Sequence, residues 1–98
     1  MNMKNVEQGL AIPMYGLHYI DSIEDVHYKK EGTALFRRDY SLEHRKKIFL
    51  SLEWAMENPE TDFNNIKPYR SDRFSNNEIY RYLKKVYIFM KENDLFNS

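Results

Sequence analysis

Three side chains in the N-terminal half have the spacing of a metal-binding triplet. His18, Asp21 and Asp25 fall at positions i, i+3 and i+7, so a helix would place all three on one side. Divalent metals accept imidazole and carboxylate ligands together. Charged helical chains also produce such triplets by chance, so we predict a solvated face and no metal site. A carboxylate-bridged two-iron bundle needs two E-x-x-H units, and Glu24 with His27 supplies one.

The chain offers few means of covalent catalysis. It has no cysteine, no G-x-S-x-G nucleophile turn and no glycine-rich phosphate loop. Metal-free cleavage of RNA is an alternative, since the fold could assemble His44 with Arg45, or His18 with His27, for acid–base work. A simpler role for His44 is in the first turn of a helix, with His27 at the edge of the core. We therefore expect a protein that is not an enzyme, with no catalytic residues and no cofactor.

Basic residues gather toward the C-terminal end. Residues 67–98 contain seven basic and four acidic side chains, whereas the whole chain has fifteen of each and no net charge. A row of cations beside Tyr69 could touch phosphates and stack on a base. The candidate nucleic-acid contacts are Arg70, Arg73, Arg81, Lys84 and Lys85. Because the net charge is nil, we expect nucleic acid to be the less favoured partner.

A second charged set, acidic and aromatic, lies in the N-terminal half. It consists of Asp21, Glu24, Asp25 and Tyr28, with Glu31 and Asp39 close in sequence. Carboxylates interleaved with aromatic rings suit a surface that covers a basic cleft, since aromatic residues anchor interfaces and charge speeds encounter. We predict that the first four of these residues bind a protein partner, with Trp54 as a second choice. The alternative is an ordinary solvated helix face.

Length and composition bound the class of protein. A chain of 98 residues makes one domain, here residues 1–98, and a hydrophobic fraction of 42% is ample for one core. The absence of cysteine removes disulfides and thiolate zinc sites and fits a reducing cytosol. The first residues lack a signal-peptide pattern, and no apolar run approaches the roughly 20 residues of a membrane span. We expect a soluble cytoplasmic protein with no membrane contact.

Two helices have clear sequence signals. For the first, residues 76–93, Ser75 is placed as N-cap, Glu78 closes a capping box, and Phe74 and Ile79 can form a hydrophobic staple. Its apolar stripe faces the core, and a largely basic face stays in water. The second starts after an N-cap at Ser41 and ends at Asn58, because Pro59 disfavours helical geometry before it.

The second helix has two apolar patches. Its main face includes Ile48, Phe49 and Leu52, and Arg45 intrudes there; we expect that side chain to lay its stem along the core with its head in water. Leu50 and Trp54 point away from this face. Either a second layer covers them or the Trp side chain meets a partner, which can equally be a second copy of the chain in a homodimer.

The elements before the second helix are signalled less clearly. Leu17 to Lys30 fits an amphipathic helix, whereas Leu10 to Tyr15 and Thr33 to Arg38 have the composition of extended segments. In the loop 60–74 we expect Phe63, Ile66 and Tyr69 to anchor the chain, with room for one helical turn. The prediction is a mainly α bundle of three to four helices, with a short β element in the N-terminal half as the α+β alternative.

Two stretches carry a resemblance to a known family. His44 to Phe63 (HRKKIFLSLEWAMENPETDF) and Arg73 to Met90 (RFSNNEIYRYLKKVYIFM) resemble the small helical immunity proteins encoded beside bacterial contact-dependent inhibition and other polymorphic toxins. The resemblance implies an immunity protein that binds a cognate toxin domain, often a nuclease, and blocks its active site or its access to substrate. It assigns no interface residues, because immunity surfaces diverge with their toxins. The alternative function is a small nucleic-acid-binding regulator that uses the basic face of the last helix.

Overall fold

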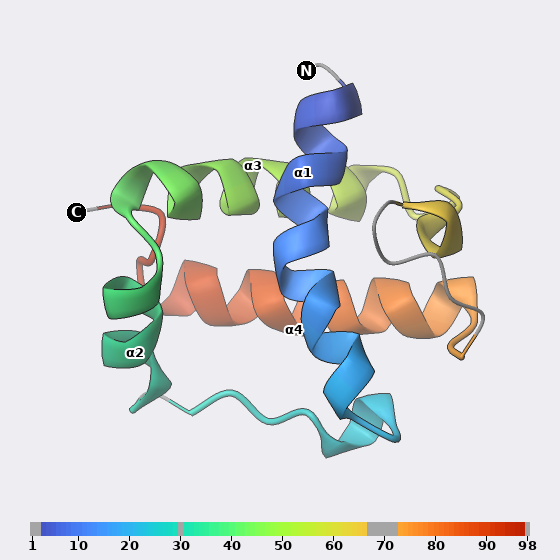
Figure 1. The fold of residues 1–98 in the computed structure, drawn as a ribbon, viewed down its shortest axis with the longest axis horizontal. Coiled ribbons are helices and arrows are strands. Elements are labelled where there is room, and N and C mark those ends of the chain that lie inside the picture. The colour runs from blue at the N-terminus through green and yellow to red at the C-terminus, as the bar shows by residue number, and fades with distance from the viewer. Residues whose placement is uncertain (1–2, 30, 67–72, 98) are drawn as a thin grey trace.

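Four α-helices make up most of the fold in the computed structural model, which describes residues 3–29, 31–66 and 73–97 (Figure 1). They are α1 (Met3–Met14), α2 (Gly32–Asp39), α3 (Leu42–Glu57) and α4 (Asn76–Glu92), with the short 3₁₀ helices η1 (Tyr15–Tyr19), η2 (Ile23–Asp25) and η3 (Phe63–Asn65) between them. The predicted mainly α bundle is confirmed, and the described residues contain no strand. None of the helices described combines the length and the apolarity that a bilayer crossing requires.

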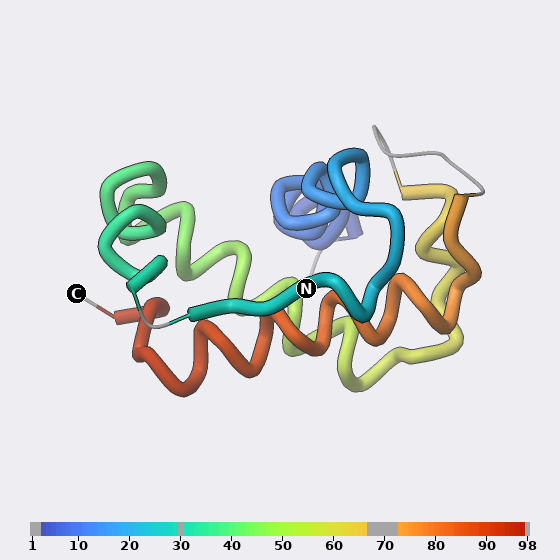
Figure 2. Tube along the Cα trace, turned by 90° about the horizontal axis from the view of Figure 1, so that it is seen from below, coloured from blue at the N-terminus to red at the C-terminus, as the bar shows by residue number. Residues whose placement is uncertain are grey.

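The helices are arranged in two layers. α3 and α4 run side by side in opposite directions, and α1 crosses them on one side and packs mainly on α3. α2 lies at the far end, beside the C-terminal end of α4 (Figures 1 and 2). The core fills the space between the layers, and its fully buried side chains are Val6, Leu10, Met14, Leu17, Ile23, Leu52, Ala55, Phe63, Ile79, Leu83, Met90 and Leu95.

α1 and α3 approach closely because Gly9 has no side chain. A Cβ atom at Gly9 would lie 2.0 Å from the Ser51 hydroxyl oxygen and 2.9 Å from the carbonyl oxygen of Lys47. Ser51 is completely buried there, and its hydroxyl donates to that same Lys47 carbonyl over 2.8 Å. Beside the crossing, the Lys47 ammonium group donates to the Gln8 side-chain oxygen at 2.6 Å. A glycine opposite a serine therefore sets the spacing of the two layers.

Both ends of α4 are closed by local hydrogen bonds. Ser75 and Glu78 form the predicted capping box, and the staple residues Phe74 and Ile79 are both buried. At the other end, the Leu95 amide donates to the Met90 carbonyl and the Asp94 amide to the Lys91 carbonyl, which is a Schellman motif. Asp94 has the left-handed backbone of that motif, with φ of 54°.

α3 begins at its predicted N-cap, because the Ser41 hydroxyl accepts a hydrogen bond from the His44 amide. The prediction for Arg45 was wrong: its head group is buried. The guanidinium donates to the carbonyls of Tyr40, Leu95 and Asn97 at 3.0–3.1 Å. The reason is that the chain entering α3 and the chain leaving α4 meet here, and their carbonyl groups need donors that water cannot supply.

The predicted amphipathic helix from Leu17 to Lys30 was also wrong. Its described residues, 17–29, comprise the end of η1, the 3₁₀ turn η2 and, after Asp25, residues in no helix or strand. Its apolar residues recur every three positions, at 17, 20, 23 and 26, which is the repeat of a 3₁₀ helix and not of an α-helix. The Ser22 hydroxyl adds a local break, since it accepts a hydrogen bond from the Glu24 amide and starts η2 there.

The short β element is contradicted by α1 and α2. Leu10 to Tyr15 belongs to α1 and the start of η1, with Pro13 in the last turn, where α1 is already ending. Thr33 to Arg38 belongs to α2. Phe36 attaches α2 to the bundle by ring contacts with Tyr40 and Phe89, so tertiary packing outweighs the extended preference of the segment.

The connection between α3 and α4 agrees with its prediction where it is described. Phe63 and Ile66 are buried anchors, and η3 is the expected helical turn. The Asn76 side-chain oxygen accepts a hydrogen bond from the Phe63 amide at 2.7 Å, which ties η3 to the start of α4. The third predicted anchor, Tyr69, lies outside the described residues.

Candidate functional site

Residues 20–29, here called the strap, connect η1 to the chain before α2 and run beside α4 (Figure 2). The strap contains the predicted partner-binding residues Asp21, Glu24, Asp25 and Tyr28, and all four are exposed. Its internal backbone hydrogen bonds are the two of η2, Asp25 to Ser22 and Val26 to Ile23. So little local bonding cannot hold an irregular segment in place, and side chains from elsewhere do so.

Cationic side chains from α4 and from Arg73, two residues before its N-cap Ser75, hold the strap. The Lys85 ammonium group donates to the carbonyls of Ile23 and Val26 at 3.0 and 3.1 Å. The Arg73 guanidinium donates to the carbonyls of Leu17 and Ile20 at 3.0 and 2.8 Å. The sequence predicted an acidic and a basic binding surface as alternatives. In the structure, basic residues of the second set hold the segment that carries the first.

An ion pair also joins the strap to α4. The Arg81 guanidinium binds the Glu24 carboxylate. This hydrogen bond, with a smaller contribution from the Arg81 charge and against some desolvation, holds the pKa of Glu24 below its usual value. Both side chains are largely in solvent, so the pair orients Glu24 more than it stabilises the fold.

Tyr28 marks the end of the strap. Its ring stacks on Phe89 of α4, with centroids 5.0 Å apart and planes inclined by 22°. Its hydroxyl makes a long hydrogen bond of 3.5 Å to the Tyr82 hydroxyl, which in turn donates to the Pro13 carbonyl at 2.6 Å. Burial of the two phenol groups raises the pKa of both Tyr28 and Tyr82, so both act as neutral groups.

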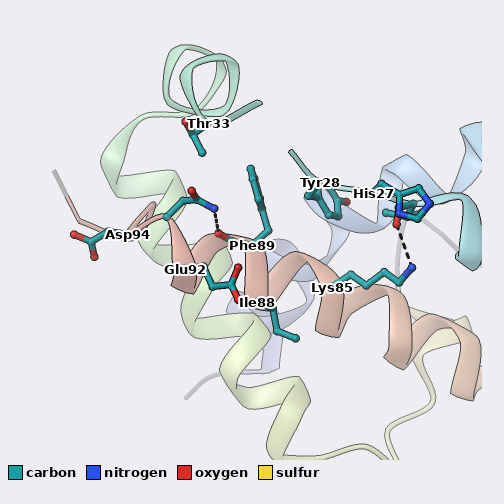
Figure 3. Close-up of a pocket in the computed structure, with 10 residues that line it drawn as sticks. His27, Tyr28, Thr33, Lys85, Ile88, Phe89, Glu92 and Asp94 are labelled. Carbon is teal, nitrogen blue, oxygen red and sulfur yellow. Dashed lines mark hydrogen bonds between the residues drawn. The ribbon is translucent and has the colours of Figure 1, made fainter. Parts of the chain in front are cut away.

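An open groove surrounds Tyr28, between the strap, α2 and the C-terminal end of α4. It has two parts, of about 860 and 480 Å³, which share His27, Tyr28 and Phe89 as a common wall. In Figure 3, Phe89 rises from α4 between Tyr28 of the strap and Thr33 of α2. The other lining residues are Val26, Thr33, Lys85, Ile88, Glu92, Asn93 and Asp94 in the larger part, and Lys29, Glu31, Gly32, Leu35, Phe36, Asp39 and Tyr40 in the smaller.

The groove combines exposed apolar side chains with an acidic border. Tyr28, Leu35 and Ile88 are 42%, 53% and 41% exposed. Four of the charged groups lining it are the carboxylates of Glu31, Asp39, Glu92 and Asp94, and two are ammonium groups, of which Lys85 is bonded to the strap. Apolar centres with charged borders are typical of surfaces that bind other proteins.

The remaining predicted contacts lie elsewhere. Trp54 is only partly exposed on α3, where it packs against the core, and it does not line the groove. Its neighbour Leu50 is exposed. Of the predicted nucleic-acid contacts, Lys84 is exposed on α4, Arg73, Arg81 and Lys85 hold the strap, and Arg70 lies outside the described residues.

His18, Asp21 and Asp25 do not share one face of an α-helix, because that helix does not form. Within residues 3–29, 31–66 and 73–97, no three His, Asp or Glu side chains gather closely enough to share a metal ion. Of the histidines, His27 is the one that lines the groove, and His44 lies in the first turn of α3.

The chain matches no protein-family model, no curated protein and no solved structure. The candidate site is therefore defined by its own geometry.

Of the residues predicted to bind a protein partner, Tyr28 lines the groove, whereas Asp21, Glu24, Asp25 and Trp54 do not, and Leu35 and Ile88 on the helices were not predicted as contacts. Ile88 carried a signal, because it is an apolar residue within the basic face of α4. No sequence signal marked Leu35 as a surface residue, because its exposure depends on α2, a helix that the composition of the segment did not predict. In the sequence, Glu92 and Asp94 look like ordinary surface charges. They line the groove because the C-terminal end of α4 lies opposite α2.

Proposed function

We propose that this protein acts by binding another protein through the groove and the strap, as a cytoplasmic immunity protein that neutralises a toxin domain by stoichiometric contact. The observation that carries the proposal is the concentration of exposed Tyr28, Leu35 and Ile88 between four carboxylates. The partner it suits presents a basic surface with an apolar side chain that enters the groove.

The energetics of such a contact follow from the side chains present. Burying the exposed parts of an aromatic and two aliphatic residues supplies affinity, and a tyrosine near the centre is a common anchor of protein interfaces. The carboxylates around them, with Asp21 and Asp25 farther along the strap, favour approach of a basic partner and raise the association rate. Apolar side chains that supply affinity and carboxylates that favour a basic partner together support tight and specific binding.

The internal use of the cations supports protein over nucleic acid as partner. Arg73 and Lys85 already donate to backbone carbonyls, and Arg81 already pairs with Glu24. Binding phosphates with these groups would release the strap, and the strap's own carboxylates would repel the nucleic acid. The specific role of immunity protein rests on the resemblance carried by α3 and α4, whereas the groove supports the mode of action.

The proposal predicts that a neighbouring reading frame encodes a toxin domain, and the test uses that domain. Titration calorimetry should show one-to-one binding, and co-expression should protect cells from that domain. A serine at Leu35 should weaken binding about tenfold, because it removes an exposed apolar contact of the groove. Leu50→Ser is the matched control, because Leu50 is equally exposed, at 52% against 53%, but lies on α3 outside the groove.

Charge supplies a second pair of variants. Glu92→Lys should slow association, and Glu57→Lys is its control, since both glutamates are exposed at the last position of a helix. The proposal fails if the neighbouring domain does not bind, or if the groove and control variants bind equally. Binding of duplex DNA or RNA with a steep salt dependence would favour the nucleic-acid regulator instead.

A further inference from the structure

A second exposed aromatic surface lies at the other end of the strap, where η1 follows α1. Tyr15, His18 and Tyr19, here called the aromatic corner, lie on one turn of 3₁₀ helix. The Tyr15 ring lies 5.5 Å from His18 in an edge contact and 5.7 Å from Tyr19, measured between centroids. Tyr15 is 58% exposed and Tyr19 is 75% exposed. Two touching tyrosine rings so open to solvent present a large area for binding.

The backbone under the aromatic corner is firmly fixed. Leu17 is completely buried, and Arg73 donates to carbonyls within the turn and just after it. Gly16 allows the Tyr82 hydroxyl to come within 2.6 Å of where a Cβ atom would stand. The rings therefore need little ordering when a partner binds, which lowers the entropic cost of contact.

The chemistry of the aromatic corner favours cations. The tyrosine faces carry the negative part of the ring quadrupole, and guanidinium and ammonium groups bind such faces. The exposed carboxylate of Asp21 follows Tyr19 by two residues, and farther along the strap come Glu24, which pairs with Arg81, and the exposed Asp25. Arg73 is a cation near the turn, and it donates to the carbonyls of Leu17 within the turn and Ile20 after it. Bases could also stack on the rings, but the two carboxylates would repel their phosphates.

We propose that the aromatic corner is a second contact site, which binds arginine or lysine side chains of a protein partner through the faces of Tyr15 and Tyr19 beside Asp21. The site rests on the proposed function in one respect only, that the cations belong to the partner held by the groove. The strap then joins two contact points, one at each of its ends, in a single interface.

The binding chemistry is tested without the partner. A hexapeptide of alternating arginine and glycine is titrated into the labelled protein at low salt, and the ring resonances of Tyr15 and Tyr19 are followed by NMR. They should shift, and the same peptide with citrulline in place of arginine should bind at least about fivefold more weakly, since it lacks the charge. The Tyr15→Leu/Tyr19→Leu protein should show the same weakening, whereas the Tyr15→Phe/Tyr19→Phe protein should bind the arginine peptide as the parent does.

Several results would overturn the site. They are unmoved Tyr15 and Tyr19 resonances, equal binding of the citrulline peptide, or shifts with a thymidine hexanucleotide that the arginine peptide does not produce. The partner experiment is then run with the leucine double variant beside Leu35→Ser. Loss of affinity in the leucine variant alone would support the aromatic corner and refute the groove, and loss in Leu35→Ser alone would do the reverse.

Discussion

In the part of the chain that the structure describes, cationic side chains donate to backbone carbonyl groups more often than to carboxylates. Arg45 donates to three carbonyls where the chain enters α3 and leaves α4. Arg37 donates to the carbonyls of Asn93 and Asp94, and Arg73 and Lys85 donate to carbonyls of the strap. Carbonyls in irregular segments have no helical partner, and a charged donor forms a stronger hydrogen bond than a neutral one. Each of these residues therefore stabilises a place where regular structure stops.

Asp94 gives a prediction at the scale of one residue. Its left-handed backbone costs a residue with a side chain free energy, and its carboxylate lies at the negative end of the α4 dipole. We expect Asp94→Gly to raise the free energy of unfolding by about 0.5–1 kcal/mol, even though the hydrogen bond from the Asn97 side chain is lost. Urea denaturation followed by circular dichroism measures the change.

Asp94→Ala is the informative comparison for that measurement. It removes the same carboxylate but keeps a Cβ atom in the left-handed conformation, so it should not gain stability. Equal stabilisation by alanine and glycine would show that charge, and not backbone conformation, limits this turn.

Between elements, two kinds of contact hold the fold. α1 and α3 touch through a close backbone approach at Gly9, which tolerates no added atoms. The strap is held by hydrogen bonds from side chains of α4 and Arg73, which leave its outer side free. The first contact is rigid because interiors are close-packed, and the second depends on a few polar groups.

The helix crossing is tested with alanine at Gly9. The new Cβ atom would lie on the Ser51 hydroxyl and against the Lys47 carbonyl, so we expect a loss of at least about 1–3 kcal/mol in the free energy of unfolding. Gly32→Ala is the matched control, since the nearest atom to its Cβ, in Phe89, is 4.0 Å away and α2 gains a better helix former. A Gly9→Ala protein as stable as the parent would contradict the described crossing.

The strap is tested by removing one donor. Lys85→Met keeps most of the stem but leaves the Ile23 and Val26 carbonyls without the ammonium group. Amide hydrogen exchange within residues 20–29 should become at least several times faster, while exchange in the middle of α3 stays as it was. Lys84→Met, on the exposed neighbour, should leave the strap protected, and Lys85→Arg should restore much of it. Unchanged exchange in Lys85→Met would mean that the hydrogen bonds of Lys85 are not what holds the strap.

Across the whole molecule, the zero net charge conceals an uneven distribution. Arg37, Arg45, Arg73 and Lys85 donate to main-chain carbonyls, and the carboxylates of the groove and strap are exposed. A net charge of zero is therefore compatible with an acidic binding face, because charge near the contact governs encounter with a partner.

Stability of the whole molecule should fall in alkali. Burial raises the pKa of the Tyr82 phenol above its ordinary value of about 10, so above that pH the unfolded chain loses a proton that the folded chain keeps. The unfolded state then binds fewer protons, and the free energy of unfolding decreases with pH, by up to about 1.4 kcal/mol per pH unit for this group. Denaturation midpoints measured from pH 8 to 11 follow the effect.

Tyr82→Phe provides the comparison. At pH 7 it should be about 1 kcal/mol less stable, because the hydrogen bond to the Pro13 carbonyl is lost. Its stability should fall less steeply above pH 10 than that of the parent. Parallel pH profiles for the two proteins would show that another group controls alkaline unfolding.

The helices with local start and stop signals could be predicted from the sequence. α3 and α4 have serine caps and defined ends, and such signals act within a few residues. The strap could not be predicted as such, because Lys85 and Arg73 fix it from 50 or more residues away. The same holds for α2, which depends on Phe36 packing on Phe89. The groove depends on both of these tertiary contacts, so of its exposed apolar residues Tyr28 was predicted as a partner contact and Leu35 and Ile88 were not.

The attachment of the strap has an evolutionary consequence. Lys85 and Arg73 donate to main-chain oxygens, which every amino acid supplies, so the path of the segment is largely independent of the side chains displayed at 21 and 25, whereas Tyr28 is itself packed on Phe89. Positions 21 and 25 can be exchanged without rebuilding the scaffold. Substitutions at these positions would therefore change which partner is bound while the backbone of the strap stays in place.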